Sequence, residues 1–175
     1  MPELRKNSMT NRYFINPSQD DLDRALESWN WLELQGKQVL LVTAFADVFF
    51  AASDGIWLLD TLEGKLKRIC KTQREFDAAL LTEEMEDTYL MAPIVDYLIN
   101  SGVTLADSEC YDFKIHPRLG GQMHHENIEA SNFVLSLNLR GQLLEQIRQM
   151  KPGTKISKFV MQNDAEPKPW WKFWA

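Results

Sequence analysis

Apolar side chains recur at helical spacing between residues 16 and 34, in the segment NPSQDDLDRALESWNWLEL. The positions that share this stripe are Leu22, Ala25, Leu26, Trp29 and Leu32. Their intervals of three and four residues predict one amphipathic helix. Ser18 stands in the N-cap position, where its side chain is expected to accept a hydrogen bond from the backbone N–H of Asp21. Gly36 is the expected end of this helix.

The pattern then changes to short apolar runs separated by turn residues. The apolar, β-branched run at residues 39–50 predicts a buried strand that is broken or bulged at Asp47. An Asp-Gly pair at residues 54–55 predicts a hairpin turn. Further strands are predicted at residues 56–60 and 65–70, with a glycine turn between them. Together these strands form a β-meander.

A second helical stretch covers residues 72–101. Thr72 and Glu75 stand three residues apart in the capping-box arrangement. Thr82 is a second N-cap candidate. Pro93 interrupts the helical pattern, so a break or kink is expected at the residue before it.

The last third of the chain predicts a strand over residues 109–117, and a strand that passes into a helix near Asn138. A short strand is expected over residues 154–161. The tail QNDAEPKPWWKFWA, residues 162–175, combines two prolines with four large aromatic side chains. Because such side chains are costly to leave in water, at least part of the tail is expected to dock on its own domain or on a neighbouring chain.

Helices that do not alternate regularly with strands predict an α+β fold. The expected architecture is a single compact domain, with a mainly antiparallel sheet and helices packed on it. Three parts are predicted along the chain: an N-terminal extension over residues 1–16, the α+β domain over residues 17–160, and a Trp-rich tail over residues 161–175.

Composition narrows the range of partners. The chain has 175 residues and a formal net charge of −6. This charge argues against nucleic acid as a partner, because a nucleic-acid binder needs a basic face for phosphates. No membrane contact is expected, since no apolar run approaches the ~20 residues of a membrane span. The first residues lack the apolar stretch of a secretory signal. We therefore expect a cytoplasmic protein with reduced thiols at Cys70 and Cys110.

All three histidines lie in KIHPRLGGQMHHENIE, residues 114–129. One hypothesis is a metal site formed by His116, His124 and His125, together with Asp112 or Glu126. The spacing does not follow the helical HExxH pattern. Adjacent histidines on a strand would also point to opposite sides. No metal ligand is therefore predicted, and a metal-dependent hydrolase built on the histidines stays open as an alternative.

The same stretch fits a stiff structural turn. His116 precedes Pro117 and is biased toward an extended conformation. Gly120 and Gly121 can adopt positive φ where the chain reverses. The chain also contains no GxSxG nucleophile motif, no phosphate-binding loop and no GxGxxG pattern. No catalytic residue and no cofactor are expected.

The densest acidic run lies in REFDAALLTEEMED, residues 74–87. Its carboxylates are Glu75, Asp77, Glu83, Glu84, Glu86 and Asp87. Two interpretations stay open: a solvated helix surface, or a negative patch that attracts a basic protein. In the second interpretation, Trp57 and Tyr89 are candidate aromatic anchors for the partner.

Two segments resemble a bacterial immunity-protein family that is linked to type VI secretion antibacterial effectors. The first, GIWLLDTLEGKLKRI at residues 55–69, is similar to a strand–turn–strand of that family. The second, residues 114–147, carries His-Pro-x-Leu-Gly-Gly, then Glu-Asn, then Gly-Gln-x-x-Glu-Gln in the family's order. The resemblance covers residues 37–157. The family's domain often follows a GAD-like domain, and residues 1–35 are shorter than such a domain.

The resemblance implies an α+β, non-enzymatic, cytoplasmic immunity protein that binds and neutralises a cognate toxin, with nucleases among the toxin classes. It also implies conformational roles, grouped here as structural turns, for Gly120, Gly121 and Gly141. An acidic protein suits a basic nuclease. A homo-oligomeric scaffold closed by the Trp-rich tail stays open as a further alternative.

Overall fold

The computed structural model of the chain describes residues 11–150 and residue 154. Within them, an antiparallel sheet has the strand order β1-β2-β3-β4-β5, and a second sheet pairs β6 with β7. The strands are β1 (Phe14–Ile15), β2 (Gln38–Thr43), β3 (Val48–Ala52), β4 (Gly55–Asp60), β5 (Lys65–Cys70), β6 (Glu109–Phe113) and β7 (Ile128–Asn132).

The α-helices are α1 (Gln19–Leu26), α2 (Gln73–Ala79), α3 (Glu83–Tyr89), α4 (Ala92–Asn100) and α5 (Phe133–Ile147). Single 3-10 turns add η1 (Asn11–Tyr13), η2 (Glu27–Trp29), η3 (Pro117–Leu119) and η4 (His125–Asn127). Strands and helices are therefore grouped rather than regularly alternating, and the predicted α+β class is confirmed.

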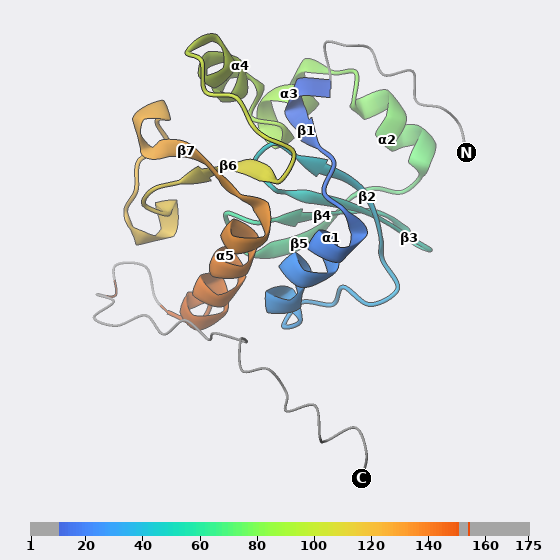
Figure 1. Ribbon diagram of the computed structural model, residues 1–175. Helices are drawn as coiled ribbons and strands as arrows, with labels where there is room; N and C mark the ends of the chain where they lie inside the picture. The colour runs from blue at the N-terminus through green and yellow to red at the C-terminus, as the bar shows by residue number, and fades with distance from the viewer. Residues whose placement is uncertain (1–10, 151–153, 155–175) are drawn as a thin grey trace, which may run out of the picture.

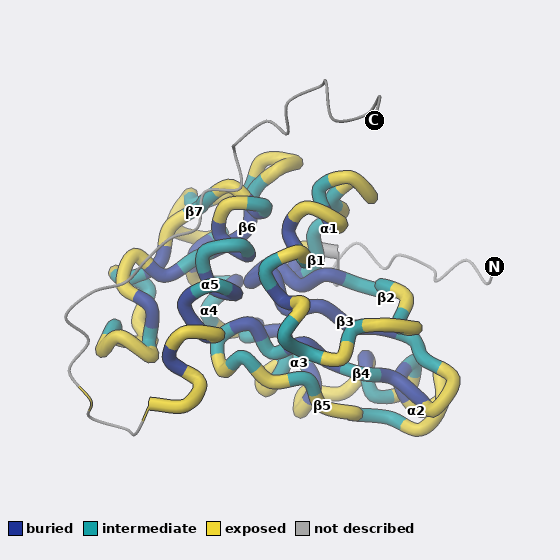
Figure 2. Tube along the Cα trace, turned by 90° about the horizontal axis from the view of Figure 1, so that it is seen from below, coloured by how far each residue is buried: buried dark blue, intermediate teal, exposed yellow. Residues whose placement is uncertain are grey.

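The five-stranded sheet is covered on both faces because its side chains alternate between two hydrophobic clusters. In β4, Ile56 and Leu58 belong to the cluster that contains residues of α2, α3 and α4. Trp57 and Leu59 instead face the cluster that contains residues of α1 and α5. Figure 1 shows α1 and α5 side by side on one face of the sheet, and Figure 2 shows buried stretches along the central strands.

The two-stranded sheet is joined to the larger sheet through the turn after β2. The backbone N–H of Tyr111 in β6 donates to the carbonyl oxygen of Ala44 at 2.7 Å. Tyr111 and Phe113 then pack around Phe45, with ring centroids 5.5 and 5.8 Å away. The long turn that contains the histidines connects β6 to β7, so it is attached to the core at both ends.

The predicted meander is confirmed, including the break at Asp47, which lies between β2 and β3. The predicted N-caps are also present: Ser18 accepts a hydrogen bond from the Asp21 N–H at 3.1 Å. Thr72 and Thr82 accept at 3.2 and 3.3 Å from the N–H groups three residues ahead.

The helical stretch breaks where the proline predicts. Met91 adopts a left-handed conformation with φ +52°, and α4 begins at the next residue with Pro93 in its first turn. The missing N–H of Pro93 is harmless there, because the first-turn N–H groups of a helix have no intrahelical partner.

Three predicted boundaries are wrong. The strand predicted over residues 109–117 ends at Phe113. The first helix ends at Leu26 and continues only as the 3-10 turn η2, so Gly36 lies in the loop that leads to β2. The last strand passes into α5 at Asn132, not near Asn138. The side chain of Asn132 caps α5 by accepting from the Leu135 N–H at 3.0 Å. The apolar run that follows Asn132 fits a buried strand and a buried helix equally well, so only the N-cap at Asn132 identifies it as a helix.

The predicted N-terminal extension, residues 1–16, ends in an edge strand: Phe14 pairs with Thr43 and Ile15 with Val42. The Trp-rich tail at residues 161–175 lies outside the described residues, as does the predicted strand over residues 154–161 apart from Thr154.

Candidate functional site

The acidic run forms the outer surface of α2 and α3. Glu83, Glu84 and Asp87 are exposed on α3, and none of the run's six carboxylates forms an ion pair with a described residue. Two are used locally: Glu75 accepts from the Lys71 N–H at 2.8 Å, and Asp77 from the Gln73 amide at 2.8 Å. We call this surface, Glu75 to Asp87, the acidic surface.

An exposed leucine stands in the middle of the acidic surface. Leu81 lies in the turn between α2 and α3 and is 84% exposed, the most exposed large apolar side chain among the described residues. Exposed leucines on their own are common on protein surfaces. This one is flanked on both sides in the sequence by carboxylate-bearing helices, so an apolar group is presented inside a negative field.

The two predicted aromatic anchors are separated by the sheet. Tyr89, at the end of α3, packs on the cluster beneath the acidic surface, and the Lys67 ammonium lies 5.2 Å from its ring centroid. Trp57 belongs to the opposite face, where its indole N–H donates to Asp54 at 2.9 Å and the Lys37 ammonium lies 4.7 Å from its ring. Only Tyr89 therefore lies on the side of the acidic surface.

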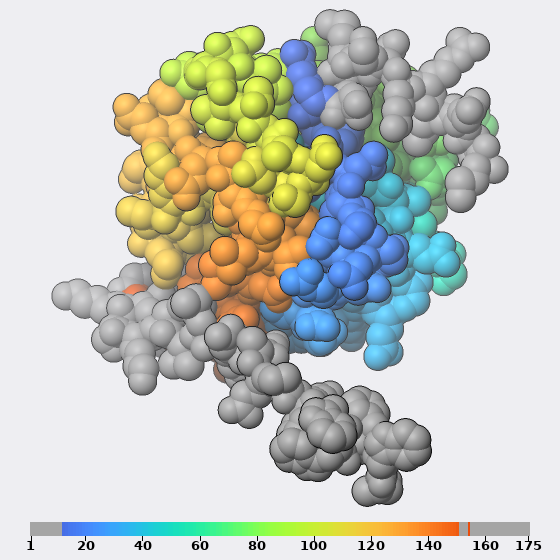
Figure 3. All heavy atoms as spheres, in the orientation of Figure 1, coloured from blue at the N-terminus to red at the C-terminus, as the bar shows by residue number. Residues whose placement is uncertain are grey.

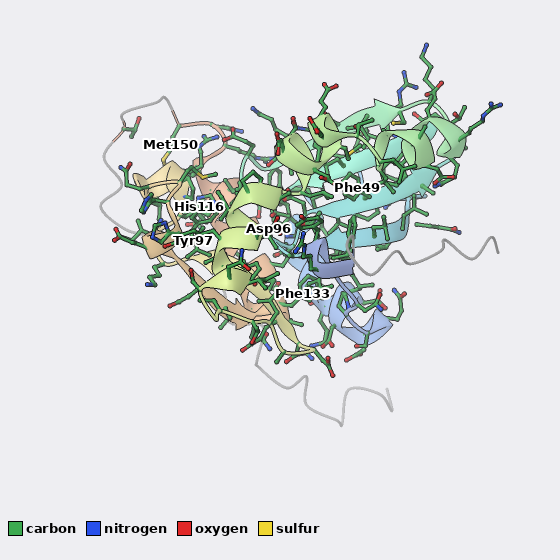
Figure 4. All side chains as sticks on the ribbon, turned by 90° about the horizontal axis from the view of Figure 1, so that it is seen from above. Phe49, Asp96, Tyr97, His116, Phe133 and Met150 are labelled. Atoms are coloured by element: carbon green, nitrogen blue, oxygen red, sulfur yellow. The ribbon has the colours of Figure 1, made fainter. Side chains whose placement is uncertain are left out.

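His116 begins the turn between β6 and β7 as a buried cap. It is 8% exposed, and its Nδ1 accepts a hydrogen bond from the Arg118 N–H at 3.2 Å. Burial, with a further contribution from the Arg140 cation, lowers the pKa of His116 to about 4. The ring is therefore neutral at pH 7, with the proton on Nε2, for which no hydrogen-bond partner is found among the described residues. Figure 4 shows His116 on the same side of the molecule as Tyr97 and far from Phe49.

The glycines of this turn meet strict geometric demands. Gly120 has φ +94°, which disfavours any residue with a side chain. Gly121 does not have the positive φ expected from the sequence, but a Cβ there would collide with the carbonyl group of Ile115. The side chain of Asn127 closes the turn by bonding to the N–H and carbonyl of Ile115, at 3.0 and 2.8 Å, and to the carbonyl of Gln122 at 3.0 Å. The conformation of the turn therefore depends on its glycines and on the Asn127 side chain.

Gly141, which the sequence groups with the turn residues, lies instead inside α5. A Cβ there would collide with the Ser28 hydroxyl and would lie 2.8 Å from the Ser28 carbonyl oxygen. The glycine therefore allows α5 to approach η2 closely. A glycine that is required for close packing does not need a positive φ. The residue type alone therefore does not show whether a glycine belongs to a turn or to a packing contact.

His124 and His125 lie closer together than an extended strand would allow. Because His124 lies at the N-cap position of η4 and His125 starts this turn, their rings lie on the same side, with centroids 4.0 Å apart and planes tilted by 41°, which corrects the expectation of opposite orientations. Together with Glu126 they offer three ligand atoms within 4.8 Å of one another. The Tyr97 hydroxyl lies 3.1 Å from Nε2 of His125.

This trio, in which His124 and Glu126 are exposed and His125 is half-buried, does not include His116. The three histidines therefore do not converge on one point, and the metal-dependent hydrolase built on all of them lacks its ligand set. His124, His125 and Glu126 could hold an ion only at the surface, where water competes for every coordination position.

A buried polar cluster that the sequence did not predict joins α5 to both sheets. Arg140 is 2% exposed and donates to the Asp112 carboxylate through Nη2 and Nε, at 2.8 and 3.0 Å. Its Nη1 donates to the Phe45 carbonyl at 2.6 Å and the Thr61 hydroxyl at 2.8 Å. We call Arg140, Asp112, Thr61 and Asp47 the buried cluster.

Asp47 completes the cluster. One of its oxygens accepts from both the N–H and the hydroxyl of Thr61, at 2.7 and 2.8 Å. Burial raises the pKa of Asp47 to about 6, with a smaller contribution from the negative charge of Asp60. The signal in the sequence was a charged residue inside an apolar run, which happens at Asp47 and again at Arg140.

A groove on the other side of the molecule separates α1 from the segment that leads to β2. It has a volume of about 560 Å³ and is lined by Gln19, Asp23, Leu26, Glu27, Asn30, Leu34, Lys37, Gln38, Val39 and Phe50. Figure 3 shows α1 and α5 next to each other on the same face of the molecule.

A family comparison bears on the part of the chain that carries these features. Residues 71–144 match the family model described as T6SS immunity protein Tdi1, C-terminal. This match confirms the resemblance to a type VI secretion immunity family. The matched segment contains the acidic surface, the histidine turn and Arg140. Residues 55–69, the first stretch of the predicted resemblance, lie outside it.

Two further comparisons complete the picture. No curated protein matches the chain. The crystal structure of Atu4351 from Agrobacterium tumefaciens is similar over 75% of this chain and 68% of that chain, at 18% identity and a TM-score of 0.47. Among the described helices, none is long and apolar enough to cross a membrane.

Proposed function

We propose that this protein is an immunity protein that binds a cognate antibacterial toxin and covers its active surface. The observation that carries the proposal is the acidic surface of α2 and α3, whose six carboxylates have no cationic partner among the described residues. This surface lies inside the segment that matches the immunity family. A protein interface would supply those cationic partners.

Charge decides which toxins fit this surface. A toxin that acts on nucleic acid must present cations to phosphates, so its substrate-binding face is basic. An acidic immunity protein that docks on this face blocks the substrate without any chemistry of its own. Electrostatic complementarity would chiefly accelerate association and reject wrong partners. The toxin class we propose is therefore a nuclease.

Leu81 supplies the apolar component of the contact. Interfaces of standard size bury about 1,600 Å² and depend on a few desolvated anchors surrounded by polar groups. Leu81 is an apolar side chain flanked by carboxylate-bearing helices, and Tyr89 adds an aromatic ring at the end of α3. Trp57 is not part of this interface, because it lies on the opposite face of the sheet.

The test uses the toxin encoded beside this protein. The triple variant Glu83→Gln, Glu84→Gln, Asp87→Asn removes three charges from the acidic surface. The matched control, Glu33→Gln, Glu129→Gln, Glu145→Gln, removes three exposed charges elsewhere. We expect at least a tenfold lower association rate for the first variant at low salt, little change for the second, and a difference that shrinks as salt is added.

Toxin activity gives the functional arm of the same experiment. An equimolar amount of the wild-type protein should abolish nuclease activity, whereas Leu81→Ser should shift the inhibition curve to higher concentration. Equal effects of the two triple variants would contradict the acidic surface as the contact. Absence of any binding to the neighbouring toxin would contradict the function itself.

A further inference from the structure

The groove beside α1 has the composition of a peptide-binding site. Its floor is formed by the apolar side chains of Leu26, Leu34, Val39 and Phe50. One wall carries Asp23 and Glu27, which stand one helical turn apart and are both exposed. Neither of these carboxylates has an ion-pair partner among the described residues.

The cation on the opposite wall is already engaged. The Lys37 ammonium donates to the Glu33 carbonyl at 2.7 Å and lies 4.7 Å from the Trp57 ring centroid. It forms no ion pair with Asp23 or Glu27. Asp23 accepts a hydrogen bond from the Gln19 amide at 2.7 Å, and no described cation pairs with either carboxylate. The groove therefore offers an apolar floor, two carboxylates without an ion-pair partner among the described residues, and a volume of about 560 Å³, within the range of ligand-binding clefts.

One segment of the same chain has the complementary chemistry. Residues 167–174, PKPWWKFW, contain three tryptophans and one phenylalanine, two lysines four residues apart, and no acidic residue. Aromatic side chains gain most from leaving water, and lysines pair with carboxylates at the rim of an apolar site. The two prolines favour an extended backbone, the form in which a peptide fits a groove.

The reach of the chain allows this contact. The last described helix ends beside the groove: the guanidinium of Arg148 lies 5.4 Å from the ring centroid of Trp31, which follows the groove residue Asn30. From Met150 to Pro169 the chain can span about 60 Å at roughly 3.3 Å per residue. A domain of this size has a radius of gyration of only about 14 Å, so every part of the groove is within reach.

We propose that residues 167–174 dock in the groove between α1 and the segment 34–39 of the same molecule, with tryptophan rings on the apolar floor and Lys168 and Lys172 against Asp23 and Glu27. The groove is on the face of the sheet opposite the acidic surface, so this contact is compatible with a bound toxin and is independent of the proposed function.

The experiment labels the full-length chain with 5-fluorotryptophan and records ¹⁹F spectra, with each signal assigned by a single Trp→Phe change. We expect the signals of Trp170, Trp171 and Trp174 to differ from those of a synthetic peptide of residues 165–175. Leu34→Asp should return the tail signals to the peptide positions. Leu81→Asp, the matched control on the exposed leucine of the opposite face, should leave them unchanged.

A second variant guards against misfolding of the first. Asp23→Lys combined with Glu27→Lys changes only exposed side chains, and we expect it to lower the docked fraction of the tail at least tenfold while the Trp29 signal of the core stays in place. Tail signals identical to the peptide in the wild type would overturn the proposal. Docked signals that neither groove variant changes would also overturn it. Signals that return to the peptide positions on twentyfold dilution would overturn it as well, because they would show that the groove binds the tail of a second copy.

Discussion

Two regions of this molecule use charge in opposite ways. In the buried cluster, Arg140 makes five hydrogen bonds to carboxylate, hydroxyl and carbonyl oxygens, and its side chain is almost fully enclosed. On the acidic surface, six carboxylates share two short helices and no described cation pairs with them. The first region satisfies its charges internally, and the second leaves them for water or for a partner.

The difference separates what holds the fold from what is available for binding. The buried cluster links α5 to β6 and to two turns of the meander, elements that are far apart in the sequence. Its charges are costly to bury and are tolerated because each has a partner. Glu75 and Asp77 accept local hydrogen bonds at the start of α2. The exposed carboxylates of α3 contribute little to the fold and are therefore available for recognition.

Removing the cation at the centre of the buried cluster should have the largest effect. Arg140→Met removes the guanidinium that donates to Asp112, Thr61 and two backbone carbonyls, and we expect the free energy of unfolding to fall by about 3–5 kcal/mol. Urea unfolding followed by circular dichroism measures this loss. Arg24→Met, which changes an exposed arginine of α1, should cost less than about 0.5 kcal/mol. Similar losses in the two variants would contradict the central role of Arg140.

The next effect concerns pH, because two buried groups respond to it with opposite signs. The pKa of Asp47 is raised to about 6, so the folded state holds its proton more tightly than the unfolded state does, and stability is lost as pH rises from about 4 to 6. The pKa of His116 is lowered to about 4, so the unfolded state takes up the proton first, and stability is lost as pH falls from about 6.5 to 4.

The two contributions oppose each other between pH 4 and 6.5, and single substitutions should separate them. Asp47→Asn should leave a protein whose stability rises with pH in this window. His116→Asn, which keeps a capping side chain, should leave one whose stability falls with pH. Each change should amount to about 2–3 kcal/mol across the window. Urea midpoints at half-unit pH steps measure both slopes, and equal slopes in the two variants would contradict the assignment.

A smaller effect is expected at the hydroxyl that connects the two halves of the buried cluster. Thr61→Val removes the group that donates to Asp47 and accepts from Arg140, and should lower the free energy of unfolding by about 1–2 kcal/mol. Thr61→Ser keeps the hydroxyl and should recover most of that loss. Thermal unfolding of the three proteins at pH 7 provides the measurement, and a serine variant as unstable as the valine variant would argue that packing, not the hydroxyl, matters here.

The sequence predicted the local elements well because their signals are local. The caps at Ser18, Thr72 and Thr82 and the break at Pro93 depend on a few neighbouring residues. The start of α5 was missed because an apolar run is ambiguous between strand and helix until Asn132 is recognised as its cap. Arg140 and Asp47 were missed as a pair because they stand 93 positions apart in the sequence (140 minus 47), and only the fold brings them together.

For the candidate site, the sequence found the charges but not their geometry. The acidic surface could be predicted because its residues are consecutive in the sequence. The sequence could not show whether Trp57 and Tyr89 share a surface, because this depends on which face of the sheet each side chain packs against. Gly141 was grouped with turn glycines, and only the position of Ser28 across the helix interface reveals its role in packing.

The smallest effect is expected on the acidic surface, where a substitution should raise the free energy of unfolding instead of lowering it. Asp87 lies three and four residues after Glu84 and Glu83 on α3, outside the first turn where the helix dipole favours negative charge. Asp87→Asn therefore removes two like-charge repulsions and should raise the free energy of unfolding by a few tenths of a kcal/mol, up to about 0.5. Urea unfolding at low salt can resolve this gain if the variant and wild type are measured side by side. A loss of 1 kcal/mol or more would mean that this carboxylate has a structural partner, and the distinction between the two regions would fail.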